Sequence, residues 1–169
     1  MKRRLVVLAV ALTTLAGCGG DPATTPAGPA SATGAATQEA PATEAAPATL
    51  PDPCELITQA DAEKLAGTPL DPPVPVRETC TYTGPVTGPT AQVEIFVGDG
   101  AKKFLDIDRE LKHEFTELAG IGDEAHLEDG TVFFAKGGVW VSIRLVRLVD
   151  PEETHKPLEA AARTAADRM

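Results

Sequence analysis

A glycine motif near the middle of the chain is the first feature that could carry chemistry. Gly120-x-Gly122-x-x-Ala125 fits the pattern G-x-G-x-x-[GA], which turns the chain beneath a pyrophosphate in dinucleotide-binding proteins. Such a turn follows a strand and opens a helix, whose N-terminus then meets the phosphates. Here a helical pattern precedes Gly120, a short strand pattern follows Ala125, and Asp123 and Glu124 would place two carboxylates beside the phosphates. We therefore interpret the stretch as a connector and expect no cofactor.

Residues that could act as nucleophiles or metal ligands are few, and they lack the required spacing. Ser142 lies within a predicted strand and Ser31 lies in a Pro-rich segment, so neither sits in a nucleophile elbow. The histidines, His113, His126 and His155, have none of the spacings of helical zinc motifs. We expect three surface histidines, no catalytic residues and no metal site, and we predict that the protein is not an enzyme.

An acidic run within a predicted helix resembles the start of a calcium-binding loop. Asp106, Asp108 and Glu110 alternate along it, but Leu111 occupies the position at which an EF-hand loop requires glycine. We interpret the run as a solvent-facing side of the helix. Carboxylate pairs for glycoside hydrolysis stay an open alternative in so acidic a chain, although no pair stands out.

The N-terminus predicts how the chain is delivered. Residues 1–17 combine a basic start with an apolar run of about ten residues, which is shorter than the ~20 residues of a membrane span. Small residues then precede Cys18, so the segment resembles a bacterial lipobox. The resemblance implies cleavage after Gly17 and attachment of diacylglycerol to Cys18, which would anchor the protein at the extracytoplasmic face of the cell membrane. An ordinary secretory signal is the alternative.

The other two cysteines, Cys54 and Cys80, are most simply a disulfide on an exported domain. In the chain-entropy description such a bond would contribute roughly 3 kcal/mol to stability. Two buried free thiols are the alternative, and a zinc site fits less well because no further ligands stand at helpful spacing.

Composition divides the remaining chain into two parts. Residues 18–50 are rich in Ala, Thr, Pro and Gly, which predicts a disordered tether that reaches roughly 30 Å as a flexible coil. Residues 51–169 have the size of a single domain. The net charge of −10 becomes about −13 without the leader, which argues against nucleic-acid partners.

Periodicity and end signals predict an α+β fold. Thr58 and Asp61 form a capping-box pattern and Gly67 a stop signal, so we expect a helix over 59–66. A second helix should start at Asp99 as N-cap and end near Leu118. Its apolar stripe comprises Phe104, Ile107, Leu111 and Phe115.

Strands are predicted over 79–83, 91–97, 125–129, 131–136 and 139–149, with a hairpin turn at Gly137-Gly138. Pro157 places the start of a C-terminal helix after Thr154. We therefore expect an antiparallel sheet of about five strands, three helices packed mainly on one face, and one disulfide.

One face of this sheet carries a candidate binding patch. Val139, Val141, Ile143 and Leu145 should face the helices, which leaves Trp140 and Arg144 on the other face. Pairing through the hairpin brings Phe133 to that face, and Phe96 points the same way. The patch of Phe96, Phe133, Trp140 and Arg144 is either covered by a helix or loop, or is a surface for a ligand or partner.

Several of these features together resemble a family of actinobacterial cell-surface lipoproteins that share a domain of unknown function. They are the Asp52-Pro53-Cys54 start, an Ile-Thr pair with an early helix, the second cysteine, Tyr82 soon after it, and G-x-G-D-x-A at 120–125. The resemblance covers residues 51 to about 148. It implies a lipid-anchored surface protein with a disulfide and no established activity.

The sequence therefore favours a non-catalytic binding or accessory module of the cell envelope, which would take a small ligand or an envelope protein as partner. An envelope enzyme with an unrecognised active site and a structural subunit of an envelope complex are the alternatives. A deep pocket with convergent polar groups would favour the enzyme.

Overall fold

The computed structural model describes residues 49–169 of the chain. The predicted signal peptide, Cys18 and nearly all of the predicted tether lie outside the described residues. Within the described part, every helix is too short or too polar to cross a membrane.

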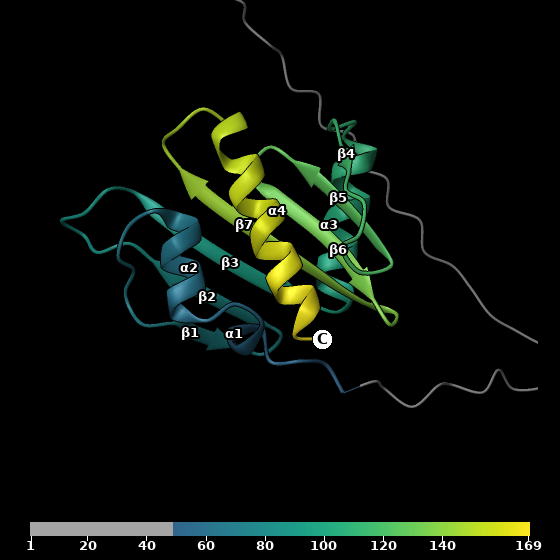
Figure 1. Cartoon of the computed structure of the whole chain (residues 1–169), viewed down its shortest axis with the longest axis horizontal. Coiled ribbons are helices and arrows are strands. Elements are labelled where there is room, and N and C mark those ends of the chain that lie inside the picture. Colours follow the sequence, from purple (N-terminus) through teal and green to yellow (C-terminus); the bar gives the residue numbers. More distant parts are fainter. Residues whose placement is uncertain (1–48) are drawn as a thin grey trace, which may run out of the picture. The chain divides into compact units, whose positions relative to one another are not determined.

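In the part of the chain that the structure describes, a single antiparallel sheet of seven strands forms the centre of the fold (Figure 1). The spatial order is β1-β2-β3-β7-β6-β5-β4, so the last strand of the sequence lies in the middle. The strands are β1 (Val74–Val76), β2 (Thr79–Thr83), β3 (Ala91–Val97), β4 (Thr116–Glu117), β5 (Glu124–Glu128), β6 (Thr131–Lys136) and β7 (Val139–Arg147). The α+β class and the antiparallel sheet are confirmed, but the prediction of about five strands omitted the two short edge strands, β1 and β4.

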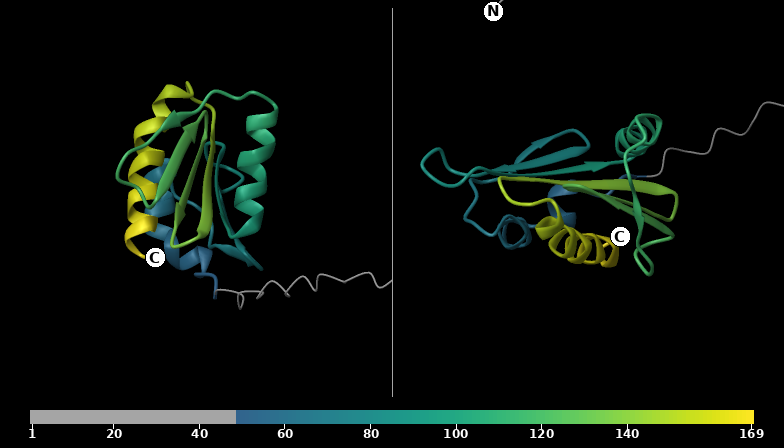
Figure 2. Two further views of the ribbon diagram at one scale, coloured as in Figure 1. Left: turned by 90° about the vertical axis from the view of Figure 1, so that its right-hand side faces the viewer. Right: turned by 90° about the horizontal axis from the view of Figure 1, so that it is seen from above.

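Within residues 49–169, four helices, rather than the predicted three, cover the two faces of the sheet. They are α1 (Pro53–Leu56), α2 (Gln59–Ala66), α3 (Asp99–Glu110) and α4 (Glu152–Asp167). Helices α1, α2 and α4 lie on one face and α3 lies alone on the other (Figure 2). We call the face under α3 the outer face.

The main core lies between the sheet and the three helices that share a face. Val141, Ile143 and Leu145 of β7 are at most 3% exposed, as predicted for this side of the strand. Leu158 and Ala162 of α4 pack against the same core and are fully buried. Burying this apolar area from water provides the main driving force that holds the helices on the sheet.

The first helical unit is pinned to the sheet by a covalent bond. Cys54 and Cys80 form the predicted disulfide, with 5.3 Å between their Cα atoms, which joins α1 to β2. Thr58 and Asp61 form the predicted capping box, and Gly67 ends α2 in the left-handed conformation with φ of 68°. These three local predictions are confirmed.

The hairpin of β6 and β7 also follows its prediction. Gly137 and Gly138 have φ of 58° and 81°, and Trp140 pairs with Ala135. Ser142 pairs with Phe133 on β6 and with Phe96 on β3, which fixes the residues that share the outer face.

The glycine motif is a connector, but the helix that we expected to end near Leu118 stops before reaching it. Helix α3 ends at Glu110, and strand β4 intervenes before the motif. At Gly122, with φ of 56°, a Cβ atom would lie 2.2 Å from the carbonyl oxygen of Ala135, so only glycine fits. The Asp123 carboxylate accepts a hydrogen bond from the Gly137 N–H, and Glu124 contacts His126.

The bounds of the two longer helices differ from the predictions. The N-cap of α3 is Gly98, not Asp99, and the expected core residues Phe104, Ile107 and Leu111 are 46–66% exposed because Ala101 and Leu105 face the sheet instead. Helix α4 begins at Glu152, so Pro157 lies inside it. Its first turn is held by i→i+3 bonds, such as that from the Thr154 N–H to the Pro151 carbonyl (2.9 Å), before the proline is reached.

Candidate functional site

A pocket of about 1140 Å³ opens on the outer face, between α3 and strands β5, β6 and β7. The largest small-molecule sites approach 1,000 Å³, so this pocket could hold a sizeable ligand. Its apolar lining residues are Phe96, Phe104, Ile107, Phe115, Leu127 and Phe133, and its polar ones are Asp108, His113, Glu114, Thr116, Glu128, Asp129, Thr131, Ser142, Arg144 and His155.

Three of the four predicted patch residues line this pocket. Phe133 is 1% exposed and lies on the pocket floor, whereas the side chain of Arg144 is 60% exposed and lies on the rim. Trp140 lies outside the lining, where the Lys102 ammonium is 5.6 Å from its ring centre. Helix α3 covers part of the face and leaves the rest as a hollow, so neither a fully covered face nor a flat patch is observed.

Aromatic pairs join the helix side of the pocket to its floor. Phe104 of α3 meets Phe96 of β3 edge to face, with 5.1 Å between ring centroids. Phe115, in the segment after α3, meets Phe133 of β6 at 6.3 Å. Edge-to-face pairs of this kind are favourable beyond the area they bury, so they hold the walls in place.

Two hydroxyl groups add hydrogen-bonding capacity to the apolar floor. Ser142 is 2% exposed and Thr131 is 8% exposed, and both line the pocket. Among residues 49–169, neither side-chain hydroxyl forms a hydrogen bond to another group. Within these residues the only buried side-chain polar atom without a hydrogen-bond partner is Gln59 Oε1, so both hydroxyls are open to the space of the pocket. A ligand or water in the pocket would provide that partner.

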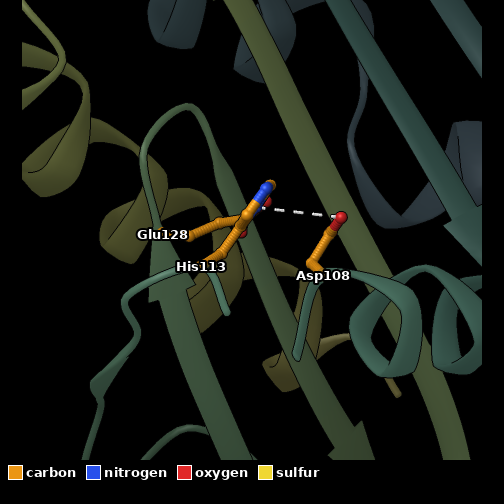
Figure 3. A group of neighbouring side chains, drawn as sticks. All are labelled: Asp108, His113 and Glu128. Atoms are coloured by element: carbon orange, nitrogen blue, oxygen red, sulfur yellow. Dashed lines mark hydrogen bonds and ion pairs between the residues drawn. The ribbon is translucent and has the colours of Figure 1, made fainter. Parts of the chain in front are cut away.

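Asp108, His113 and Glu128 converge on the pocket from three segments (Figure 3). Asp108 belongs to α3, His113 to the segment that follows it, and Glu128 ends β5. The Nδ1 atom of His113 lies 2.9 Å from Glu128 Oε2 and 3.8 Å from Asp108 Oδ1. We call these three residues the rim cluster.

Ionisation within the rim cluster is coupled to its geometry. The hydrogen bond to Glu128 raises the pKa of the His113 imidazole, and both carboxylates add to that effect. Burial raises the pKa of the Glu128 carboxyl, since its side chain is only 10% exposed, and the nearby Asp108 charge acts in the same direction. A carboxyl group with a raised pKa beside a histidine is an arrangement that active and metal-binding sites share.

The end of α3 explains why Asp108 and His113 lie side by side. Lys112 has φ of 62°, and its N–H donates to the Arg109 carbonyl, while the His113 N–H donates to the Asp108 carbonyl (3.0 Å). This pair of bonds is a Schellman motif, in which the two residues that frame the end of the helix usually form an apolar contact. Here those two positions hold a carboxylate and an imidazole.

A second polar group supports α3 from the strand side. It contains His126, which is 7% exposed, so the expectation of a surface residue was wrong for this histidine. The Nε2 atom of His126 lies 2.6 Å from Glu124 Oε1 and 2.8 Å from Arg109 Nη2. Hydrogen bonds from His126, and secondly from Arg109, lower the pKa of the Glu124 carboxyl despite a slight opposing effect of burial. Because this cluster joins helix to sheet and is absent from the pocket lining, we assign it a structural role.

The rim cluster was missed by the sequence analysis. Asp108 was interpreted as part of a solvated helix face and His113 as a surface residue, and no metal site was expected. Sequence spacing gives little signal, because Glu128 joins the cluster only through the pairing of β5 with the rest of the sheet. The end of α3 could have indicated that Asp108 and His113 lie close together. The apolar stripe that continues to Phe115 led us to place that end too late.

Comparisons with known proteins identify the family of the chain without identifying an activity. The family model DUF3558, described as a protein of unknown function, matches residues 13–133, so the chain belongs to this family. The match confirms that the chain contains a family domain of unknown function, as the resemblance implied. The matched range starts earlier and ends sooner than the expected range of 51 to about 148. No curated protein and no solved structure matches the chain.

Proposed function

We propose that this member of the DUF3558 family is a lipid-anchored binding module of the cell envelope, and that the outer-face pocket is its ligand site. The anchor follows from the lipobox pattern before Cys18. The single observation that supports binding is the pocket itself, which combines an aromatic floor with two hydroxyls that are open to the pocket and form no hydrogen bond within residues 49–169.

The lining indicates the class of ligand. An aromatic floor of this size suits a small molecule with an apolar ring body, and Ser142 and Thr131 would bind a polar group on it. Four carboxylates line the pocket, namely those of Asp108, Glu114, Glu128 and Asp129, against the single guanidinium of Arg144. Their repulsion disfavours an anionic ligand, so the polar group should be neutral or cationic.

Binding of the neutral dye Nile red to the full chain in detergent-free nanodiscs tests the site. Ser142→Leu places a larger side chain on the pocket floor and removes its hydroxyl, so we expect dye binding to weaken by at least tenfold. Thr81→Leu is the matched control, because Thr81 pairs with Glu94 on the same sheet face but is absent from the pocket lining. Far-UV circular dichroism checks that both variants are folded.

Equal dye binding by Ser142→Leu and the wild type would contradict the assignment of the pocket. A second experiment, native mass spectrometry of the protein extracted from membranes, searches for the physiological ligand. A copurifying small molecule that Ser142→Leu fails to retain would identify the ligand class.

A second candidate function is hydrolysis in the envelope, and the convergence of the rim cluster favours it. Glu128, with its raised pKa, would be the general acid, and Asp108 would be the second carboxylate. The test is turnover of cell-wall glycan fragments by the wild type and by Glu128→Gln. Product release by the wild type that Glu128→Gln abolishes would establish the enzyme, whereas equal rates would exclude this mechanism.

A further inference from the structure

We propose that Asp108, His113 and Glu128 form a binding site for one divalent transition-metal ion of the zinc type. The rim cluster offers one imidazole nitrogen and two carboxylate groups, the donor types that zinc accepts in proteins. The proposal does not depend on the ligand-binding function, because the metal site would exist whether or not the pocket holds an organic molecule.

The distances within the rim cluster are near those that a tetrahedral ion requires. With metal–ligand bonds near 2.1 Å, tetrahedral ligand atoms lie about 3.4 Å apart. The His113 nitrogen lies 2.9 Å from Glu128 and 3.8 Å from Asp108, so one contact must lengthen slightly and the other shorten slightly. All three donor atoms already lie within 4.8 Å of one another.

The backbone holds two of the three ligands in place before any ion arrives. Asp108 and His113 occupy the two framing positions of the Schellman motif, which fixes their mutual distance through backbone hydrogen bonds. Glu128 ends β5, which pairs with β6 along its whole length. Because backbone hydrogen bonds hold the chain at these positions, little backbone entropy is lost when the ion binds.

The charge of the site favours a cation. Asp108 and Glu128 hold two negative charges close together, and the side chain of Glu128 is nine-tenths buried. Among residues 49–169, His113 is the only basic side chain within bonding distance of either carboxylate. A divalent ion would neutralise both carboxylates and displace the proton that His113 now shares with Glu128.

The donor set selects zinc over the hard cations. Ca²⁺ requires about six to eight oxygen ligands, and Mg²⁺ keeps several of its own waters in a strict octahedron. The rim cluster provides only two carboxylates, and its third donor is a nitrogen, which suits transition metals. With three protein ligands, a tetrahedral ion would keep one position open toward the pocket, as catalytic zinc sites do.

Isothermal titration of Zn²⁺ into the full chain in detergent, at about pH 8, tests the proposal. All proteins carry Cys18→Ser so that a free thiol does not compete for zinc. We expect one Zn²⁺ per chain with micromolar or tighter affinity, and no heat of binding with Ca²⁺. Asp108→Asn, His113→Ala and Glu128→Gln should each weaken Zn²⁺ binding at least about tenfold. Removing a residue that only orients a metal ligand already reduces metal affinity by about that factor.

Two substitutions of pocket residues outside the cluster serve as matched controls. His155→Ala removes an imidazole that faces Asp129, and Glu114→Gln removes an exposed carboxylate next to His113. Both should bind Zn²⁺ as the wild type does. Asp108→Asn and Glu128→Gln preserve side-chain shape, so they decide the matter even if His113→Ala fails to fold.

Three results would overturn the metal site. They are failure of the wild type to bind Zn²⁺, wild-type affinity in all three rim-cluster variants, and a loss in His155→Ala as large as that in His113→Ala. Binding of Ca²⁺ as tight as that of Zn²⁺ would overturn the assignment of the metal class. None of these results bears on Nile red binding to Ser142→Leu, so the two proposals fail separately.

Discussion

Replacing Gly122 with alanine should destabilise the fold far more than the same change at Gly120. Both glycines have left-handed backbones, with φ of 56° and 72°, so each substitution incurs a similar conformational cost of about 1–2 kcal/mol. The surroundings differ. A Cβ atom at Gly122 would lie 2.2 Å from the Ala135 carbonyl oxygen, whereas one at Gly120 would first meet a flexible guanidinium at 3.5 Å.

The additional cost at Gly122 follows from what the added carbon would displace. The Ala135 oxygen accepts a 2.7 Å hydrogen bond from the Asp123 N–H, and Ala135 is the register partner of Glu124 at the start of the β5–β6 ladder. Moving that oxygen away breaks one or two bonds worth about 1 kcal/mol each. We therefore expect Gly122→Ala to lower the free energy of unfolding by about 3 kcal/mol and Gly120→Ala by about 1 kcal/mol.

Urea denaturation of the full chain, followed by far-UV circular dichroism, measures both changes. Gly122→Val adds a β-branched side chain to the same contact, so it should also lower the yield of folded protein. Equal losses at Gly120 and Gly122 would mean that the close approach to Ala135 has no energetic role. A neutral Gly122→Ala would refute the turn as described.

Three further predictions concern separate features of the chain. Burial favours a higher pKa for the Asp61 carboxyl, but hydrogen bonds from Thr58 and Arg168 outweigh it and lower that pKa. Asp61→Asn should therefore cost about 1 kcal/mol at neutral pH in urea denaturation, and the difference from wild type should vanish as pH falls through the folded-state pKa. Lys112→Gly relieves the left-handed residue at the end of α3 and should stabilise the chain by about 0.5–1 kcal/mol in the same assay. Unchanged stability would contradict the strain assigned to this residue. Cys18→Ser should release the chain from the membrane fraction, and continued association would contradict the lipobox.

The sequence predicted best the parts of the fold that local chemistry determines. The capping box at Thr58, the stop at Gly67 and the Gly137-Gly138 turn each depend on backbone rules that act over a few residues. The alternation in β7 was equally clear, because its buried side faces helices and its other side faces the pocket. Local rules of this kind need no knowledge of the rest of the molecule.

Elements that depend on distant partners were harder to predict. Strand β1 comprises Val74, Pro75 and Val76, all exposed, and its proline resembles a loop signal although an edge strand tolerates it. The end of α3 was placed too late, because Leu111 and Phe115 continue the apolar stripe, although Leu111 is exposed and Phe115 lines the pocket. Helix α4 starts ahead of the position that Pro157 suggested.

The candidate site was predictable only as a face of the sheet. Strand pairing placed Phe96, Phe133 and Arg144 together, and these residues do line the pocket. The hollow itself depends on how far α3 covers that face, which periodicity does not specify. Predicting the rim cluster would have required both the true end of α3 and the register of β5. The spacing of residues in the sequence gives neither.

The central position of β7 has a consequence for when the protein can fold. Among residues 49–169, the strands β1, β2 and β3 form one ribbon and β4, β5 and β6 form another, and only β7 pairs with both. Because β7 follows both ribbons in the sequence, the two ribbons cannot join into one sheet before β7 has been synthesised. The complete sheet should therefore form late, after its central strand becomes available.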